Sequence, residues 1–215
     1  ISQSKISQTL TLNPQQWSNL KGFKKLVAHF YNQTSFLIDK KVRRDNTVFV
    51  INPFEDYFEN ELAAINNFRN VLFFNKGKQR FTSSYTFIAM SNKNFLSIGL
   101  TKSKLKSHQL NFNHKFWNDW LINLKGTISE NKSLNKNFET RNYRLETYEI
   151  NPKISYLLST KTRFDIFYNY LNKENQLNNF ELLIQQKIGV SFNYANVKKI
   201  AINGEFNFIN NNFIG

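Results

Sequence analysis

The feature that most constrains the fold is an alternation of apolar and polar side chains with a period of two residues, repeated in one segment after another beyond residue 80. In residues 120–129 the even positions include Ile122 and Leu124, whereas the odd positions include Asn123 and Lys125. Successive side chains of a β-strand point to opposite faces of a sheet. Each such segment is therefore predicted to be a strand with one apolar face.

The alternation predicts a meander of strands. The predicted strands are Leu96–Thr101, Leu110–Phe116, Trp120–Ser129, Tyr148–Leu158, Phe164–Leu171, Ile184–Tyr194 and Ile200–Phe208. Short turns are predicted at Ser91–Asn94, Trp117–Asp119, Ser159–Thr162 and Asn196–Lys199, and longer polar linkers at Lys102–His108, Ser129–Asn142 and Asn172–Glu181. Short turns at one end and long loops at the other are typical of outer-membrane barrels. Pro152 cannot donate to a ladder, so it is predicted to mark a bulge or a strand end.

Residues 1–80 show a weaker pattern. Strands are predicted around Ile6–Leu12, at Phe23–Gln33, at Phe68–Phe74 and at Phe81–Met90. Residues 34–67 are predicted to be a long polar loop or insertion, with one additional strand at Thr47–Ile51 so that the turns alternate sides. These assignments give about a dozen strands in a single β-barrel region, 1–215.

Strand length favours a sheet in lipid over a sheet in water. Strands of soluble domains run about 5–6 residues, whereas a strand that crosses a bilayer needs about 9–11. In a soluble sandwich the same apolar face would be a core, and the alternation alone leaves that alternative open. The predicted fold class is all-β: an antiparallel meander of long amphipathic strands forming an up-and-down transmembrane β-barrel or part of one.

The two faces are predicted to have different surroundings because the charges fall on odd positions. The residues predicted to face lipid are Ile122, Leu124, Ile154, Ile166, Ile188, Val190, Phe192, Ile202 and Phe206. The residues predicted to face the lumen are Lys115, Lys125, Lys153, Asp165, Lys187 and Glu205. Trp17, Trp117 and Trp120 lie at or beside predicted short turns, where an interfacial aromatic belt is expected.

Composition excludes several alternatives. The chain has no Cys, which removes disulfides and thiolate metal sites, and it has no run of 18 apolar residues, which excludes a transmembrane helix. Aromatic residues make up 16% of the chain against 7 Gly and 3 Pro, which favours strands over disorder. The sequence begins at Ile1 without an initiator Met or leader, which predicts a mature or trimmed product.

The region Phe68–Gly215 resembles outer-membrane β-barrel proteins of the Bacteroidota, in particular the C-terminal barrel regions of large surface proteins. The similar phrases are FRNVLFFNKGKQRFTSSYTF, LKSHQLNFNHKF, YEINPKISYLLSTKTRFDIFYNY and QQKIGVSFNYANVKKIAINGEF. The resemblance implies the bacterial outer membrane, contact with its lipid, other outer-membrane or lipoprotein subunits as further partners, and a transport, secretion or surface-scaffold role. It supplies no functional residues. Members commonly end on a strand that closes with an aromatic residue, whereas here Phe213 follows a predicted polar turn at Asn210–Asn212, so a fragment of a longer chain is predicted.

No catalytic or cofactor motif is recognisable: there is no Gly-rich phosphate loop and no nucleophile elbow. We therefore predict no enzymatic activity, no cofactor and no metal site. His108 and His114 share a parity but have no nearby Cys or carboxylate, so packed or interfacial histidines are favoured over a metal pair. The acidic cluster Glu55, Asp56, Glu59 and Glu61 lacks the pattern of a calcium loop, and neutralisation by Lys40, Lys41, Arg43 and Arg44 is favoured.

The net charge of +14 favours partners that carry phosphate. Basic residues with interleaved aromatic residues can follow nucleic-acid phosphates and stack on bases, so a ribosome-associated nucleic-acid-binding protein is the alternative function. Against nucleic acid, Lys102, Lys104, Lys106, Lys132 and Lys136 cluster in predicted long loops, where they would meet anionic lipid headgroups.

Overall fold

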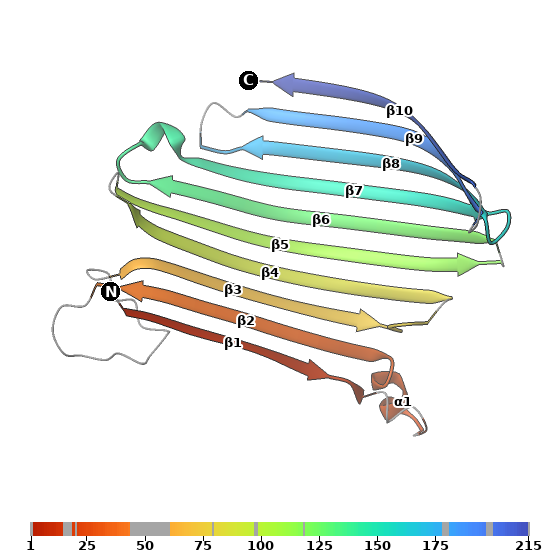
Figure 1. Ribbon diagram of the computed structural model, residues 1–215, viewed down its shortest axis with the longest axis horizontal. Coiled ribbons are helices and arrows are strands. Elements are labelled where there is room, and N and C mark those ends of the chain that lie inside the picture. Colours follow the sequence, from red (N-terminus) through yellow and green to blue (C-terminus); the bar gives the residue numbers. More distant parts are fainter. Residues whose placement is uncertain are drawn as a thin grey trace.

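The computed structural model describes residues 2–14, 19, 21–43, 61–78, 80–96, 99–117, 119–177, 181–196 and 200–214, and within them ten strands form one antiparallel sheet (Figure 1). The strands are β1 Ser2–Leu12, β2 Phe30–Val42, β3 Glu61–Phe74, β4 Phe81–Leu96, β5 Gly99–Phe116, β6 Trp120–Asn135, β7 Tyr143–Leu157, β8 Thr162–Asn175, β9 Leu182–Asn196 and β10 Ile200–Ile214. A short helix, α1 (Phe23–Val27), precedes β2, and a 3-10 turn, η2 (Glu139–Arg141), precedes β7. The prediction of an all-β antiparallel meander is confirmed.

The sheet is a single layer of long strands. Each strand pairs with its neighbours in sequence, and β1 and β10 are the two edges within the described residues. The strands contain 11 to 18 residues, which exceeds the length typical of soluble domains. Thr47–Ile51, the additional predicted strand, lies outside the described residues, so ten strands rather than about a dozen are seen. No helix in the described part of the chain is long and apolar enough to cross a membrane.

Several strands extend into segments predicted to be turns or linkers. Ser91–Asn94 belongs to β4 and Lys102–His108 belongs to β5, so the predicted turn and the predicted linker are both wrong. Leu96 pairs with Gly99, which divides the predicted strand Leu96–Thr101 between β4 and β5. The predicted linkers after β6 and β8 shorten to 136–142 and 176–181. In all these places the backbone pairing continues where polar or charged side chains replace the apolar residues on the even positions or at the turn.

The N-terminal region also differs from the prediction. Residues 23–27 form α1 rather than the start of a strand, and Gly22, at φ +69°, adopts a left-handed conformation that favours glycine immediately before it. β2 then continues to Val42, and β3 begins at Glu61. The predicted polar loop 34–67 is therefore limited to 43–60, because polar residues of β2 and β3 pair in a ladder that extends to a register shift at Lys41 and Val42.

Two predicted interruptions lie inside strands. Pro152 is in the middle of β7, where it pairs with Leu124 of β6. On the other side, the ladder between β7 and β8 is interrupted at Asn151 and Pro152 and resumes in the same register at Lys153. The missing N–H of proline therefore removes ladder pairs without a bulge. The predicted turn at Asn210–Asn212 lies within β10, paired with residues 184–186 of β9.

The connections differ between the two ends of the sheet, although less regularly than predicted. At one end they are 43–60, 97–98, 136–142 and 176–181, and at the other 13–29, 75–80, 117–119, 158–161 and 197–199. The two-residue connection 97–98 is the exception at the first end, and the segment 13–29 that contains α1 is the exception at the second. The first is called the long-loop end below, and the second the short-turn end.

Candidate functional site: the two faces of the sheet

The strand register places the predicted residues on two opposite faces. All nine residues predicted to face lipid lie on the face formed by even positions of β5–β10, here called the apolar face. All six residues predicted to face the lumen lie on the other, the polar face. In β4 the parity reverses, since Phe81 pairs with His114 and Phe87 with His108, so odd positions of β4 join the apolar face.

Apolar side chains form continuous rows across the strands of the apolar face. One row contains Phe81, His114, Ile122, Ile154, Ile166, Val190 and Phe206, each directly opposite the next in the ladder. Five rows stack along the strands, from Trp120 to Ile128 on β6, and are here called the apolar band. The two rows nearest the long-loop end also contain the polar residues Asn172, Gln186, Asn210 and Asn212. Within the band on β4–β10, the only ionisable side chains are two histidines and several tyrosines. Its nine residues per strand match the length needed to cross a bilayer, about 9–11.

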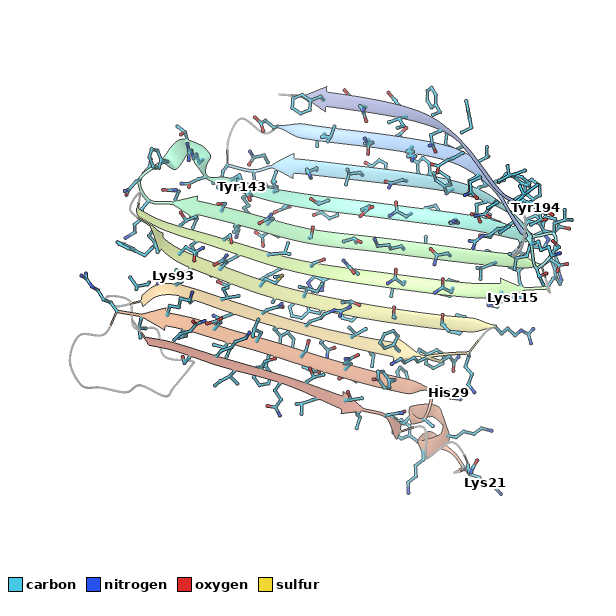
Figure 2. All side chains as sticks on the ribbon, in the orientation of Figure 1. Lys21, His29, Lys93, Lys115, Tyr143 and Tyr194 are labelled. Carbon is cyan, nitrogen blue, oxygen red and sulfur yellow. The ribbon has the colours of Figure 1, made fainter. Side chains whose placement is uncertain are left out.

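Exposure on the two faces is the reverse of that in a water-soluble protein. Large apolar side chains are exposed, with Phe206 at 72% and Ile188 at 52%. Most of the buried side chains are small and polar, with Ser155 at 1%, Thr86 and Ser107 among them. Within the described residues no second layer of strands or helices covers either face (Figure 1). Figure 2 shows side chains along the length of the strands.

Three glycines in the strands support this difference between the faces. Gly126 and Gly204 lie on the apolar face, and a Cβ added at either would meet nothing within 4 Å. Gly189 lies on the polar face, and a Cβ there would overlap the side chains of Asn207 and Phe167. The polar face is therefore crowded, whereas the apolar face is open.

The last row of the apolar band at the short-turn end is aromatic on five adjacent strands. Its members are Phe116, Trp120, Tyr156, Phe164 and Phe192, from five adjacent strands in direct register. The ring centroids of Trp120 and Tyr156 are 4.8 Å apart, and those of Phe164 and Phe192 are 4.9 Å apart. Trp117 is exposed in the adjacent turn, and Trp17 lies outside the described residues. Aromatic girdles occupy this position in transmembrane barrels.

The polar face carries a network of charged and hydroxyl side chains. Asp165 is buried, and one of its carboxylate oxygens accepts a hydrogen bond from the Arg163 guanidinium at 2.6 Å. The Lys153 ammonium lies 3.0 Å from the other carboxylate oxygen. The hydroxyl of Ser191 donates to Asp165 at 3.3 Å, and the Arg163 guanidinium donates to Ser155 at 2.8 Å. Four of these five residues come from β7 and β8 and one from β9, so the network joins three strands across the polar face.

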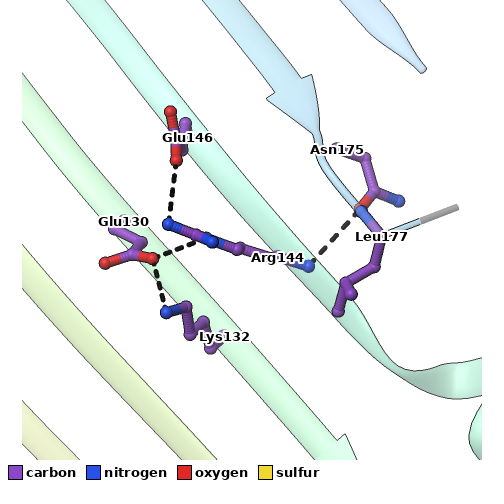
Figure 3. A network of polar contacts seen from close by, with 6 residues as sticks. All are labelled: Glu130, Lys132, Arg144, Glu146, Asn175 and Leu177. Atoms are coloured by element: carbon purple, nitrogen blue, oxygen red, sulfur yellow. Dashed lines mark hydrogen bonds and ion pairs between the residues drawn. The ribbon is translucent and has the colours of Figure 1, made fainter. Parts of the chain in front are cut away.

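A basic belt lies beyond the apolar band at the long-loop end. It is defined as Lys93, Lys102, Lys104, Lys106, Lys132 and Arg144, all on the apolar face of β4–β7. Figure 3 shows its β6–β7 part, where Glu130 lies 2.8 Å from the Lys132 ammonium and 2.7 Å from the Arg144 guanidinium. Arg144 also reaches Glu146 at 3.3 Å, and its backbone N–H donates to Asn175. The Arg144 guanidinium and the carboxylates of Glu130 and Glu146 thus hold one another in place.

The sequence analysis grouped Lys102, Lys104, Lys106 and Lys132 but predicted them to lie in loops, whereas they lie on β5 and β6. Lys102, Lys104 and Lys106 occupy every second position, which is itself the period of a strand. Lysines therefore alternate here with small or apolar side chains. The strand prediction relied on apolar residues at even positions, and these resume only at Leu110.

The histidines are placed by packing. His108 accepts from or donates to the Tyr85 hydroxyl at 2.7 Å and lies against Phe87, while His114 stacks near Phe116. The two rings lie in different rows of the apolar band, three rows apart. In the described part of the chain no group of three or more His, Asp or Glu side chains is arranged to hold a metal ion. The acidic cluster at residues 55–61 lies outside the described side chains.

Comparison with known proteins identifies no relative. No protein-family model matches the chain, and no curated protein and no solved structure matches it significantly. The resemblance of Phe68–Gly215 to Bacteroidota barrels therefore stays a prediction.

Proposed function

We propose that this chain forms the wall, or part of the wall, of a β-barrel in the bacterial outer membrane, with a non-enzymatic role in transport, secretion or surface scaffolding. The observation that carries the proposal is the exposed apolar band, which is nine residues tall. It ends in an aromatic row at the short-turn end, and at the long-loop end it is followed by a row of charged side chains that contains Lys106, Glu130, Glu146 and Glu174. An apolar surface of this extent marks contact with a membrane or a protein. The regular height of the band and its two polar borders favour a membrane.

The backbone is also suited to lipid. A strand in hydrocarbon must pair all of its N–H and C=O groups. The ladders between β2 and β9 are continuous except for a register shift at Lys41 and Val42 and a gap between β7 and β8 at Asn151 and Pro152, opposite Tyr168 and Asn169. β1 and β10 each present one edge with no partner among the described residues. The proposal requires these edges to pair with each other or with further strands, since an open edge is unstable in lipid.

The polar face supplies the interior of the proposed barrel. Its small hydroxyl and amide side chains and its paired charges suit a lumen that contains water or a polar plug. The polar face carries charges of both signs, because Asp165 and Glu205 lie on it together with Lys115, Lys125, Lys153 and Lys187. The long-loop end is assigned to the cell exterior and the short-turn end to the periplasm, because that orientation is general for such barrels.

The test is the dependence of the folded chain on a membrane-like solvent. The full chain, expressed with an export signal, is expected to fractionate with outer membranes, to require detergent for extraction, and to migrate differently on a gel before and after heating. A chain that remains monodisperse in buffer without detergent would contradict the proposal. Steeply salt-dependent binding of RNA by such a soluble chain would instead favour the nucleic-acid alternative.

A further inference from the structure

We infer that the basic belt is a binding site for the phosphate groups of anionic membrane lipid, an inference that rests on the proposed function. The belt lies on the same face as the apolar band and begins in the next row beyond it. Lys106 of β5 is two residues from His108, the last band residue of that strand, and Lys104 and Lys102 follow at two-residue intervals. A lipid whose acyl chains cover the band would therefore have its headgroup at the height of the belt.

The strand register concentrates positive charge in the belt. Lys93 is directly opposite Lys102, Lys104 is directly opposite Lys132, and Lys132 is directly opposite Arg144. Side chains directly opposite in an antiparallel ladder are close neighbours, and like charges in that position are destabilising. Glu130 lies between Lys132 and Arg144 and offsets the repulsion of that pair. For the pair of Lys104 with Lys132, a further anion beside Lys104 would be stabilising.

Carboxylates of the protein neutralise the β6 and β7 side of the belt. Glu130 and Glu146 contact Lys132 and Arg144 on β6 and β7. For Lys102, Lys104 and Lys106, the described part of the chain offers no carboxylate within ion-pair distance. Lys104 and Lys106 are also exposed. The β5 side of the belt is thus open to an external anion, whereas the β7 side is held in place by its own acidic partners.

Lipid phosphate fits this position better than a free phosphate ion. The lysines are spread along β5 on the open surface and have no enclosing cavity, so an isolated ion would stay largely hydrated and weakly bound. A lipid is already held at the surface by its acyl chains, and each nearby cation then adds about 1 kcal/mol. Lysine side chains also suit an interface, since their apolar stems lie along the surface while the ammonium reaches the headgroup.

The experiment measures lipid binding to the purified full chain in neutral detergent micelles by native mass spectrometry. Phosphatidic acid is titrated as the anionic probe, and phosphatidylcholine is the matched lipid without net charge. The test variant is Lys102→Gln, Lys104→Gln, Lys106→Gln. The control variant, Lys115→Gln, Lys125→Gln, Lys173→Gln, removes the same charge from the polar face. A third variant, Lys102→Arg, Lys104→Arg, Lys106→Arg, preserves the positive charge of the belt.

The wild type is expected to bind phosphatidic acid, with affinity falling as salt is raised. The glutamine variant at the belt is expected to lose roughly 10-fold or more in affinity, while the control and arginine variants stay within about 2-fold of wild type. Equal loss in the control variant, or unchanged affinity in the belt variant of a chain that still requires detergent, would overturn the inference and leave the proposed function standing. Displacement of the lipid by equimolar inorganic phosphate would show a simple ion site, which also overturns it. A chain that folds without detergent would instead contradict the proposed function.

Discussion

Asp165 and Ile166 are adjacent in β8, yet Asp165 is 8% exposed and Ile166 is 57% exposed. The same contrast holds for the two faces as wholes: one is polar, crowded and partly buried, and the other is apolar and open. In water, the hydrophobic effect would favour the reverse arrangement by about 25 cal/mol for each Å² of apolar surface. The comparison indicates that the apolar face is built for a solvent or partner that is itself apolar.

The largest effect is expected from a charge placed in the middle of the apolar band. Ile188 lies in the central row, between Tyr168 and Phe208, so Ile188→Arg brings a guanidinium to the deepest level. We expect it to lower the free energy of unfolding by about 2–4 kcal/mol in lipid vesicles, measured by urea titration.

The matched control for that substitution is Asn203→Arg, which places the same side chain on the exposed polar face of β10. It is expected to be tolerated. Ser191 is less suitable as a control, because its hydroxyl donates to Asp165. Equal sensitivity of Ile188 and Asn203 would show that the assignment of the faces is wrong. Since a soluble core would also be damaged by Ile188→Arg, the comparison is made together with the test for detergent dependence.

The next largest effect is expected from adding a methyl group to each face. Gly189→Ala drives a Cβ into Asn207 and Phe167 on the crowded polar face and is expected to destabilise by about 1–3 kcal/mol. Gly126→Ala enters open space on the apolar face and is expected to be neutral or to stabilise by up to about 1 kcal/mol, because it restricts the unfolded chain. Thermal and urea unfolding of the two variants compare the faces with the same chemical change. A greater loss at Gly126 would contradict the assigned difference in crowding.

A smaller effect is expected when the network of the polar face loses its carboxylate. Asp165→Asn leaves Arg163 and Lys153 without their common anion, and these side chains are 40% and 36% exposed. The expected loss is about 1–2 kcal/mol, between the values for exposed and buried ion pairs. Glu205→Gln, which removes the exposed partner of Lys187, is expected to change stability little. A urea titration in which both variants behave alike would show that burial does not strengthen the Asp165 network.

The smallest effect tests the border of the apolar band. Ile202 pairs with Tyr194, one row beyond the aromatic row that contains Phe192. Ile202→Arg is therefore expected to cost only about 0–1 kcal/mol, as charges do near the interface. The ratio of the losses at Ile188 and Ile202, measured in the same vesicles, reports the depth of each side chain. Equal losses would place the aromatic row away from the interface.

The sequence by itself determined the fold class and the composition of the two faces. A period of two residues assigns each side chain of a strand to a face whatever its neighbours are, so the nine apolar and six charged residues lie on opposite faces. The apolar alternation does not mark the strand at Ser91–Asn94, where both faces are polar, or at Lys102–His108, where lysines occupy the apolar face, because backbone pairing continues without it. It also failed at Pro152, where flanking ladder pairs hold the register across the missing N–H.

The register between strands was decided only by the tertiary structure. Lys104, Lys132 and Arg144 are far apart in sequence, and they form one row because the ladders of β5, β6 and β7 align them. The aromatic row from Phe116 to Phe192 arises in the same way across five strands. The burial of Asp165 also depends on neighbouring strands, since its partners Lys153 and Ser191 come from β7 and β9. Alternation assigns a residue to a face, but only the pairing of strands sets its height and its neighbours there, because those contacts join residues that no local pattern connects.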